Sequence, residues 1–197
     1  MNISGIILAG GKSSRMGEDK CFVQLSNKYF IDFIIETFLQ YGICDIIINT
    51  NSPFKFSHYP YPICVDVIPE KGPLGGIYSA LKMSNNEENI IIPCDSPFIT
   101  PELIDVLIQT NKNHEITFPK LDGIYYPLIG CYKKSAIHFI KSLLDKNELK
   151  ARNLINYPQT SILNFSEDNY GIDDIELVFA NINDKKSLQY YEENVPC

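Results

Sequence analysis

The chain has 197 residues, 45% of them hydrophobic and 21% charged, and this balance excludes a wholly disordered chain. Its length predicts a single domain over residues 1–197. The net charge of −7 argues against nucleic acid as a partner, so an anionic small molecule has to bind in a local basic pocket.

Six cysteines occur without a C-x-x-C pair, which argues against a zinc ribbon or a thioredoxin motif. An even number also suits a secreted disulfide scaffold, but Cys44, Cys64, Cys94 and Cys131 lie in or beside apolar runs typical of buried thiols. The first residues lack the basic start of a signal peptide, and no window approaches the roughly 20 apolar residues of a membrane span. We therefore expect reduced thiols in a cytoplasmic protein without a membrane partner.

The stretch 6–20, IILAGGKSSRMGEDK, predicts a strand, a glycine turn and a basic loop in succession. The residues at the turn and in the loop that matter are Ala9, Gly10, Gly11, Lys12, Arg15 and Lys20. Backbone N–H groups at a glycine turn can face a bound anion, and basic side chains beside them neutralise its charge. The spacing fits neither a Walker A loop nor a dinucleotide fingerprint. The alternative to a phosphate site is a strand followed by a solvated basic loop.

Two further strands are predicted at 44–49 and 63–68, after a helix over 28–42 that Gly42 closes. Asn49 ends the first strand, and ligands of open parallel sheets gather at such carboxyl ends, although an asparagine there is also a common turn former. Asp66 lies on the second strand. A second glycine turn at 72–76, which includes Gly75, then opens a helix at 77–83. Two glycine turns after two strands predict convergence on one ligand, although the second alone reads equally as a helix cap.

A buried strand over 89–92 stops at Pro93 and delivers Asp95 to its carboxyl end. A carboxylate there is a candidate ligand for Mg²⁺, which typically takes one or two protein carboxylates together with substrate phosphate oxygens. The alternative is a helix-entry turn, since Thr100 and Pro101 begin the next helix.

The rest of the chain continues the alternation of strands and helices. Helices are predicted over 100–111 and 134–144, and strands over 115–118, 124–132 and 161–165, with a hairpin turn at Asp122 and Gly123. A strand at 177–179 leads to Asn183 or Asp184, one of which caps the final helix. This alternation predicts a three-layer α/β domain with a mostly parallel sheet.

Three motifs resemble those of the molybdenum cofactor guanylyltransferases. Residues 8–20 match L-A-G-G-x-S-x-R-M-G-x-x-K, residues 72–76 match G-P-L-[AG]-G, and residues 94–97 match C-D-[ST]-P. The resemblance covers the whole chain and implies a Rossmann-like nucleotidyltransferase fold. It also implies transfer of GMP from GTP to the terminal phosphate of molybdopterin, giving molybdopterin guanine dinucleotide and pyrophosphate.

The resemblance assigns roles to individual residues. Gly10, Gly11, Lys12 and Arg15 cradle the triphosphate, Lys20 reaches the α-phosphate or the pyrophosphate, and Asp95 holds Mg²⁺, so that Arg15, Lys20 and Asp95 form the catalytic set. The base-binding set is Leu8, Ala9, Gly10 and Asn49 at the edge of guanine, with Asp66 accepting from its N1–H and N2–H₂ and Gly75 on the second motif. Arg152, Asn181 and Asn183 face molybdopterin, and the alternative for Arg152 is a solvated surface position.

The resemblance has one departure and further implications. Tyr126 stands where the family has a His-Pro-containing segment, which bears on pterin binding. Transient contact with molybdenum-insertion and molybdoenzyme-maturation proteins is expected as well. Two alternatives stay open: a nucleotidyltransferase of the same fold that uses CTP on molybdopterin or another NTP on a sugar phosphate, and a nucleotide-binding regulator without turnover. Gly10 and Cys94 argue against the first, and the presence of both Lys20 and Asp95 argues against the second.

Overall fold

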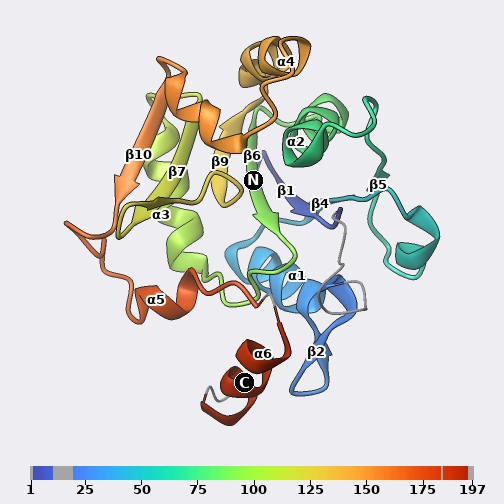
Figure 1. Cartoon of the computed structure of the whole chain (residues 1–197), viewed down its shortest axis with the longest axis vertical. Coiled ribbons are helices and arrows are strands. Elements are labelled where there is room, and N and C mark those ends of the chain that lie inside the picture. Colours follow the sequence, from blue (N-terminus) through green and yellow to red (C-terminus); the bar gives the residue numbers. More distant parts are fainter. Residues whose placement is uncertain (1, 11–19, 183, 195–197) are drawn as a thin grey trace.

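A central β-sheet organises the protein in the computed structural model, which describes residues 2–10, 20–182 and 184–194 (Figure 1). Across the sheet the strands run in the order β10-β7-β9-β6-β1-β4-β5, with the short β8 added beside β7. Their bounds are β1 Ile3–Leu8, β4 Asp45–Asn49, β5 Ile63–Cys64, β6 Glu88–Pro93, β7 Ile116–Leu121, β8 Ile124–Tyr125, β9 Gly130–Lys133 and β10 Thr160–Asn164. Only β8 and β9 pair antiparallel within this sheet, so the predicted mostly parallel sheet is confirmed.

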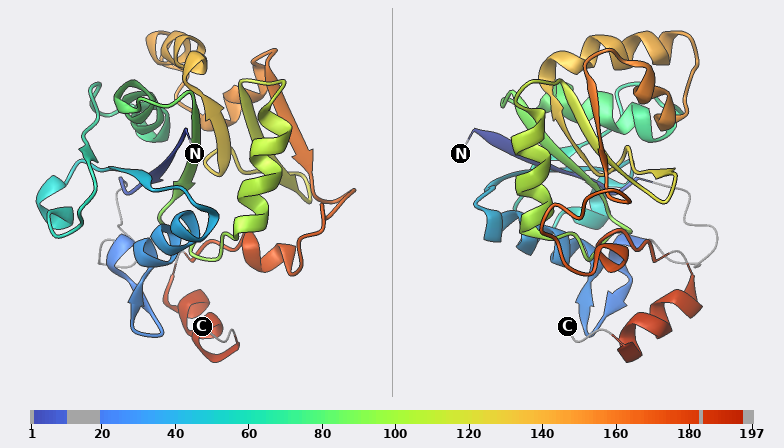
Figure 2. Two further views of the ribbon diagram at one scale, coloured as in Figure 1. Left: turned by 180° about the vertical axis from the view of Figure 1, so that it is seen from behind. Right: turned by 90° about the vertical axis from the view of Figure 1, so that its left-hand side faces the viewer.

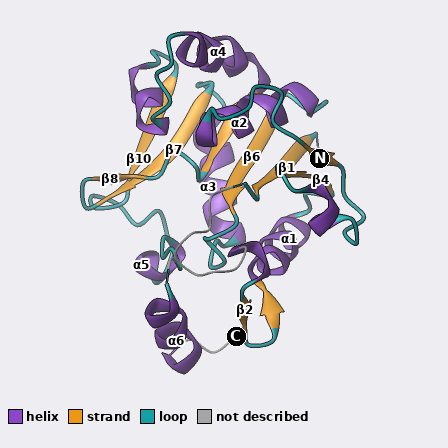
Figure 3. Cartoon of the chain, turned by 45° about the vertical axis from the view of Figure 1, so that its right-hand side comes forward, coloured by secondary structure: helices purple, strands orange, loops and turns teal. Residues whose placement is uncertain are grey.

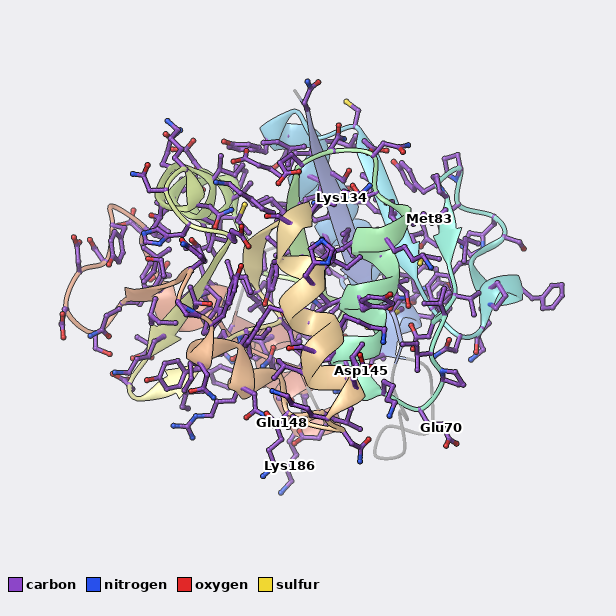
Figure 4. The ribbon with its side chains drawn as sticks, turned by 90° about the horizontal axis from the view of Figure 1, so that it is seen from above. Glu70, Met83, Lys134, Asp145, Glu148 and Lys186 are labelled. Atoms are coloured by element: carbon purple, nitrogen blue, oxygen red, sulfur yellow. The ribbon has the colours of Figure 1, made fainter. Side chains whose placement is uncertain are left out.

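Helices cover both faces of the sheet, which makes three layers (Figure 2). On one face, α1 (Phe30–Tyr41) packs against α3 (Pro101–Asn111), and on the other α2 (Gly72–Met83) packs against α4 (Ile137–Asp145). Seen from above, α2 and α4 lie side by side, with Glu70 and Met83 near the two ends of α2 (Figure 4). The strands alternate between the two cores: Ile90 and Ile92 of β6 face the α1–α3 side, whereas Ile91 faces the α2–α4 side.

A smaller core joins the segment 23–30 to the C-terminal part of the chain. The hairpin of β2 (Gln24–Leu25) and β3 (Lys28–Tyr29) packs beside the C-terminal helix α6 (Lys185–Asn194), with α5 (Ile175–Val178) nearby (Figure 3). Leu25, Phe30 and Ile182 are fully buried between them. The C-terminal segment therefore returns to the region that follows β1.

Several predicted elements are confirmed. α1 ends at Gly42, whose φ of 93° is a left-handed conformation that glycine adopts without steric cost. The turn at Asp122 and Gly123 joins β7 to β8 as an antiparallel hairpin. Asp184 caps α6, since its Oδ1 accepts from the N–H of Ser187 at 2.8 Å, while Asn183 lies outside the described residues.

Other predicted elements are wrong in extent or type. The strand predicted at 63–68 stops at Cys64, and the strand predicted at 124–132 is interrupted around Pro127, which has no N–H to pair. The segment 177–179, for which the sequence predicts a strand, falls largely in α5. Cys44 is exposed, whereas Cys64, Cys94 and Cys131 are buried as expected, and these four carry free thiols.

The segment 72–76 also differs from its prediction, because it is the first part of α2 and not a turn before it. Pro73 stands at the start of that helix, where its missing N–H and fixed φ are favourable. Across the described ranges, 2–10, 20–182 and 184–194, no helix is long and apolar enough to cross a lipid bilayer.

Candidate active site

The carboxyl ends of four parallel strands meet at one edge of the sheet. Leu8 at the end of β1 is in register with Asn49 of β4 and Pro93 of β6, and Asn49 is in register with Cys64 of β5. Backbone hydrogen bonds continue beyond the strands, from Ala9 N to Asn49 O at 2.8 Å and from Cys94 N to Leu8 O at 3.1 Å. The predicted ligand-binding segments after β1, β4, β5 and β6 therefore share one edge.

Lys20 and Asp95 meet at this edge although 75 residues separate them. The Nζ of Lys20 donates to Oδ2 of Asp95 at 2.9 Å, and the side chains are 22% and 24% exposed. Asp95 lies two residues beyond the end of β6, and Lys20 begins the 3-10 turn Lys20–Phe22. An ammonium group and a carboxylate held together at a ligand-binding edge can act on a phosphate and on its counter-cation, respectively.

Asn49 and Asp66 form a second pair at the same edge. The Nδ2 of Asn49, which is buried, donates to Oδ1 of Asp66 at 2.9 Å and to the carbonyl of Cys64 at 3.2 Å. Asp66 lies just beyond β5 and is half-buried. A half-buried carboxylate with a fixed hydrogen-bond donor is suited to accept further hydrogen bonds from a ligand.

Two glycines of the second motif, Gly75 and Gly76, lie close to Asn49 and Asp66. A Cβ at Gly76 would lie 3.3 Å from Cγ of Asn49 and nearer than 3.0 Å to its Oδ1, closer than real Cβ atoms come. A Cβ at Gly75 would lie 3.8 Å from Oδ2 of Asp66. The helix α2 therefore packs closely against Asn49 because Gly76 lacks a side chain, whereas a Cβ at Gly75 would make only an ordinary van der Waals contact with Asp66.

Comparison with known proteins decides the family. The model of the MobA-like NTP transferase domain matches residues 5–161 of the chain. The chain belongs to the MobA-like NTP transferase family. A relative from Flavobacterium johnsoniae, named probable molybdenum cofactor guanylyltransferase, is 37% identical over 187 residues, which are 92% of this chain and 97% of the relative. One of the same name from Clostridium perfringens is 37% identical over 75% of this chain and 74% of the relative.

A solved structure agrees with this family on the fold. The molybdopterin-guanine dinucleotide biosynthesis protein A from Archaeoglobus fulgidus superposes with a TM-score of 0.82 and 21% identity, covering 96% of this chain and 97% of that one. The predicted Rossmann-like nucleotidyltransferase fold is thereby confirmed for this MobA-like protein.

The C-terminal segment of the MobA-like protein is tied to the turn that carries Asp95. The buried hydroxyl of Ser96 donates to Oδ1 of Asn181 at 2.7 Å, and Ile182 N donates to the carbonyl of Asp95 at 3.2 Å. Asn181, which is predicted to face the pterin, is thus brought to the sheet edge that carries Asp95. Arg152 has a different setting, in the 3-10 turn Ala151–Asn156, with its guanidinium 5.1 Å from the ring centre of Tyr125. Gly11, Lys12, Arg15 and Asn183 lie outside the described residues.

The fit of a divalent cation rests on Asp95. Its carboxylate is partly exposed at the sheet edge, which suits Mg²⁺, since this ion commonly takes one or two protein carboxylates and completes its shell with water and phosphate oxygens. In the part of the chain that the structure describes, no group of three or more His, Cys, Asp or Glu side chains is arranged to hold a metal ion.

Three residues at this edge were not singled out from the sequence. Gly76 and Ser96 lie inside the matched motifs, which could have drawn attention to them, but their partners Asn49 and Asn181 are far away in sequence. Asn51 also contacts Asp66. An asparagine two residues after a strand reads as a turn former, so its contact had no sequence signal.

The predicted aromatic departure also has a place in the structure. Tyr126 stacks on Phe179, with the ring centres 4.8 Å apart and the planes at 27°. Burial and the nearby charge of Asp122 raise the pKa of the Tyr126 hydroxyl above its ordinary value, so the phenol stays neutral near pH 7. The stacking on Phe179 places Tyr126 against the segment that carries Asn181.

Proposed function

We propose that this MobA-like protein transfers GMP from GTP to the terminal phosphate of molybdopterin, forming molybdopterin guanine dinucleotide and releasing pyrophosphate. The names of its relatives support the reaction and its substrates. The observation that carries the proposal is the Lys20–Asp95 pair at the sheet edge that also holds Asp66 and Asn49. The cytoplasm is the proposed location.

The chemistry joins one anionic phosphate to another. An oxygen of the molybdopterin phosphate attacks the α-phosphorus of GTP, and the bond from that phosphorus to the β-phosphate oxygen breaks, so pyrophosphate leaves with the electron pair. The enzyme's main task is therefore to position the reactants and neutralise their charge. The nucleophile is already ionised, so no general base is needed.

Each charged residue takes one part of that task. Lys20 stabilises the negative charge that develops on the α-phosphate and the departing pyrophosphate, and Gly10, Gly11, Lys12 and Arg15 bind the triphosphate. Asp95 would hold Mg²⁺, which would supply charge neutralisation at the phosphate oxygens. Lys20 pairs with Asp95 at 2.9 Å, so the ammonium group lies beside the carboxylate that would hold the ion.

Base and pterin recognition use the neighbouring residues. Asp66 accepts from N1–H and N2–H₂ of guanine, while Leu8, Ala9, Gly10, Asn49 and Gly75 complete the nucleotide site. Asn181 faces the pterin with Arg152 and Asn183. The finished cofactor then passes on through transient contacts with molybdenum-insertion and molybdoenzyme-maturation proteins.

The test uses purified protein incubated with molybdopterin, Mg²⁺ and each of the four NTPs in turn, with pyrophosphate release followed. We expect release with GTP that depends on molybdopterin. Preferential release with CTP would transfer the assignment to the cytidylyltransferases, and absence of release with every NTP would favour a nucleotide-binding regulator.

A further inference from the structure

Asn51 holds Asp66 through two hydrogen bonds. Its Nδ2 donates to Oδ2 of Asp66 at 2.9 Å, and its Oδ1 accepts from the backbone N–H of Asp66 at 3.2 Å. One planar amide thus contacts both the main chain and the carboxylate of the same residue. Rotation of the Asp66 side chain would break the first of these bonds while the second kept Asn51 in place.

The backbone on both sides of Asn51 is also fixed. The N–H of Thr50 donates to the carbonyl of Cys64 at 2.9 Å, and the hydroxyl of Thr50 accepts from the N–H of Ser52 at 3.1 Å. Thr50 is 2% exposed. Asn51 itself is exposed, so its side chain is positioned by its hydrogen bonds to Asp66 and not by burial.

We propose that Asn51 is a positioning residue that sets the Asp66 carboxylate for recognition of guanine, an inference that rests on the proposed function. A carboxylate has about four lone-pair sites, two on each oxygen. Asn49 uses one site on Oδ1, and Asn51 uses one on Oδ2. Each oxygen therefore keeps one site, which matches the two adjacent donors of guanine, N1–H and N2–H₂.

Asn49 and Asn51 bind different oxygens of the Asp66 carboxylate. Both contacts matter because the terminal torsion angle of an aspartate side chain otherwise takes a broad range of values. Asn49 alone holds Oδ1 and leaves the carboxylate plane able to turn about that contact. With Asn51 on Oδ2, the plane is fixed before a base arrives. Preorganisation of this kind favours a ligand that needs both oxygens over one that needs a single oxygen.

A comparison of GTP with inosine triphosphate (ITP) separates a ligand that needs both Asp66 oxygens from one that needs a single oxygen. Its hypoxanthine base keeps N1–H and O6 but lacks the exocyclic amine, so it can use only one oxygen of Asp66. Loss of Asn51 should therefore harm GTP more than ITP. The loss should reduce the ratio of GTP to ITP in kcat/KM about three- to tenfold, which corresponds to roughly 0.7 to 1.4 kcal/mol.

The experiment compares wild type, Asn51→Ala, Asn51→Asp and a matched control, Asn169→Ala. The Oδ1 of Asn169 likewise accepts from a backbone N–H in its own loop, that of Gly171 at 3.1 Å, but this loop follows β10, which is the strand farthest from β5 across the sheet. kcat/KM is measured for GTP and ITP, and the Kd of each is measured by calorimetry without molybdopterin. Thermal unfolding reports whether each variant is folded.

We expect the GTP to ITP ratio to fall in Asn51→Ala and to fall further in Asn51→Asp, because the new carboxylate repels Asp66. Asn169→Ala should keep the wild-type ratio. If the ratio of the Kd values for GTP and ITP is unchanged in both folded Asn51 variants, the inference is overturned. Asn51 then only stabilises the conformation of its loop. Wild type that binds GTP well yet transfers nothing contradicts the proposed function only, since the Kd ratios still test Asn51.

Discussion

Substituting Gly76 by alanine tests whether α2 positions Asn49. The added Cβ meets the carboxamide of Asn49 at a separation that real Cβ atoms do not reach, so the amide has to move by several tenths of an ångström. The 2.9 Å hydrogen bond from Asn49 to Asp66 then lengthens or breaks. Hydrogen bonds to a charged group contribute about 1.5 to 3 kcal/mol. Asp66 is only half-buried, so we expect about 1 to 2 kcal/mol, or roughly five- to thirtyfold in kcat/KM for GTP.

Two opposing contributions determine the effect of this substitution on folding. Alanine stabilises a helix interior by about 1 kcal/mol relative to glycine, whereas overpacking costs typically 1 to 3 kcal/mol. The assay therefore pairs kcat/KM for GTP with thermal unfolding. Gly76→Ala, Asn49→Ala and the double variant form a cycle that isolates the coupling between the two positions.

If Gly76→Ala acts through Asn49, adding it to Asn49→Ala should cause little further loss, because the displaced group is already gone. Two losses that simply add would refute this reasoning. Wild-type activity in a folded Gly76→Ala protein would do so as well, because it would mean that Asn49 can move without consequence.

Three other substitutions address neighbouring groups. Lys20→Ala should lower kcat more than it raises the KM for GTP. The control Lys28→Ala, which removes the exposed ion pair with Glu36, should leave kcat and KM unchanged. A defect in KM alone would make Lys20 a binding residue only. Asp66→Ala should reduce the preference for GTP over CTP and ATP about ten- to a hundredfold, and an undiminished preference would mean that the backbone reads the base. Ser96→Ala should raise the KM for molybdopterin more than that for GTP, since it releases Asn181; equal changes in both would assign Ser96 to stability alone.

The sequence was most informative where short-range pattern and strand order coincide. The apolar runs that became β1, β4 and β6 predicted buried parallel strands, and their last residues did come to one edge of the sheet. Because these strands end at one edge, the segments that carry Asn49, Asp66 and Asp95 lie close together. Lys20 and Asp95 pair at that edge, while the predicted roles of Lys20 toward phosphate and of Asp95 toward Mg²⁺ stay predictions.

The sequence was less informative where a local signal has two structural meanings. Gly72 and Pro73 indicate a turn, yet proline is equally favourable in the first turn of a helix, and α2 begins there. The run at 177–179 is apolar enough for a strand, but it packs as a helical turn against residues distant in the chain, such as Tyr126. Periodicity over three residues cannot separate these outcomes.

Two contacts between residues distant in the sequence could not be predicted from it. Ser96 meets Asn181 across 85 residues, and Asn51 meets Asp66 across 15 residues from a segment that reads as a loop. Short polar side chains of this kind are common in turns, so their identity alone does not indicate a partner. Only the fold brings these side chains to the groups that they contact, the amide of Asn181 and the carboxylate of Asp66.

The most direct test of the proposed reaction is detection of the dinucleotide product itself. GTP, molybdopterin and Mg²⁺ are incubated with wild type, Asp95→Asn or Asp145→Asn, and the product is quantified by mass spectrometry. Asp145 pairs with Lys141 on α4 and provides a matched control for loss of a carboxylate from a lysine pair. We predict molybdopterin guanine dinucleotide from wild type and Asp145→Asn, and a loss of orders of magnitude, about a hundredfold or more, in folded Asp95→Asn. Wild type that makes no such product, or Asp95→Asn that makes it at the wild-type rate across a Mg²⁺ titration, would contradict the account.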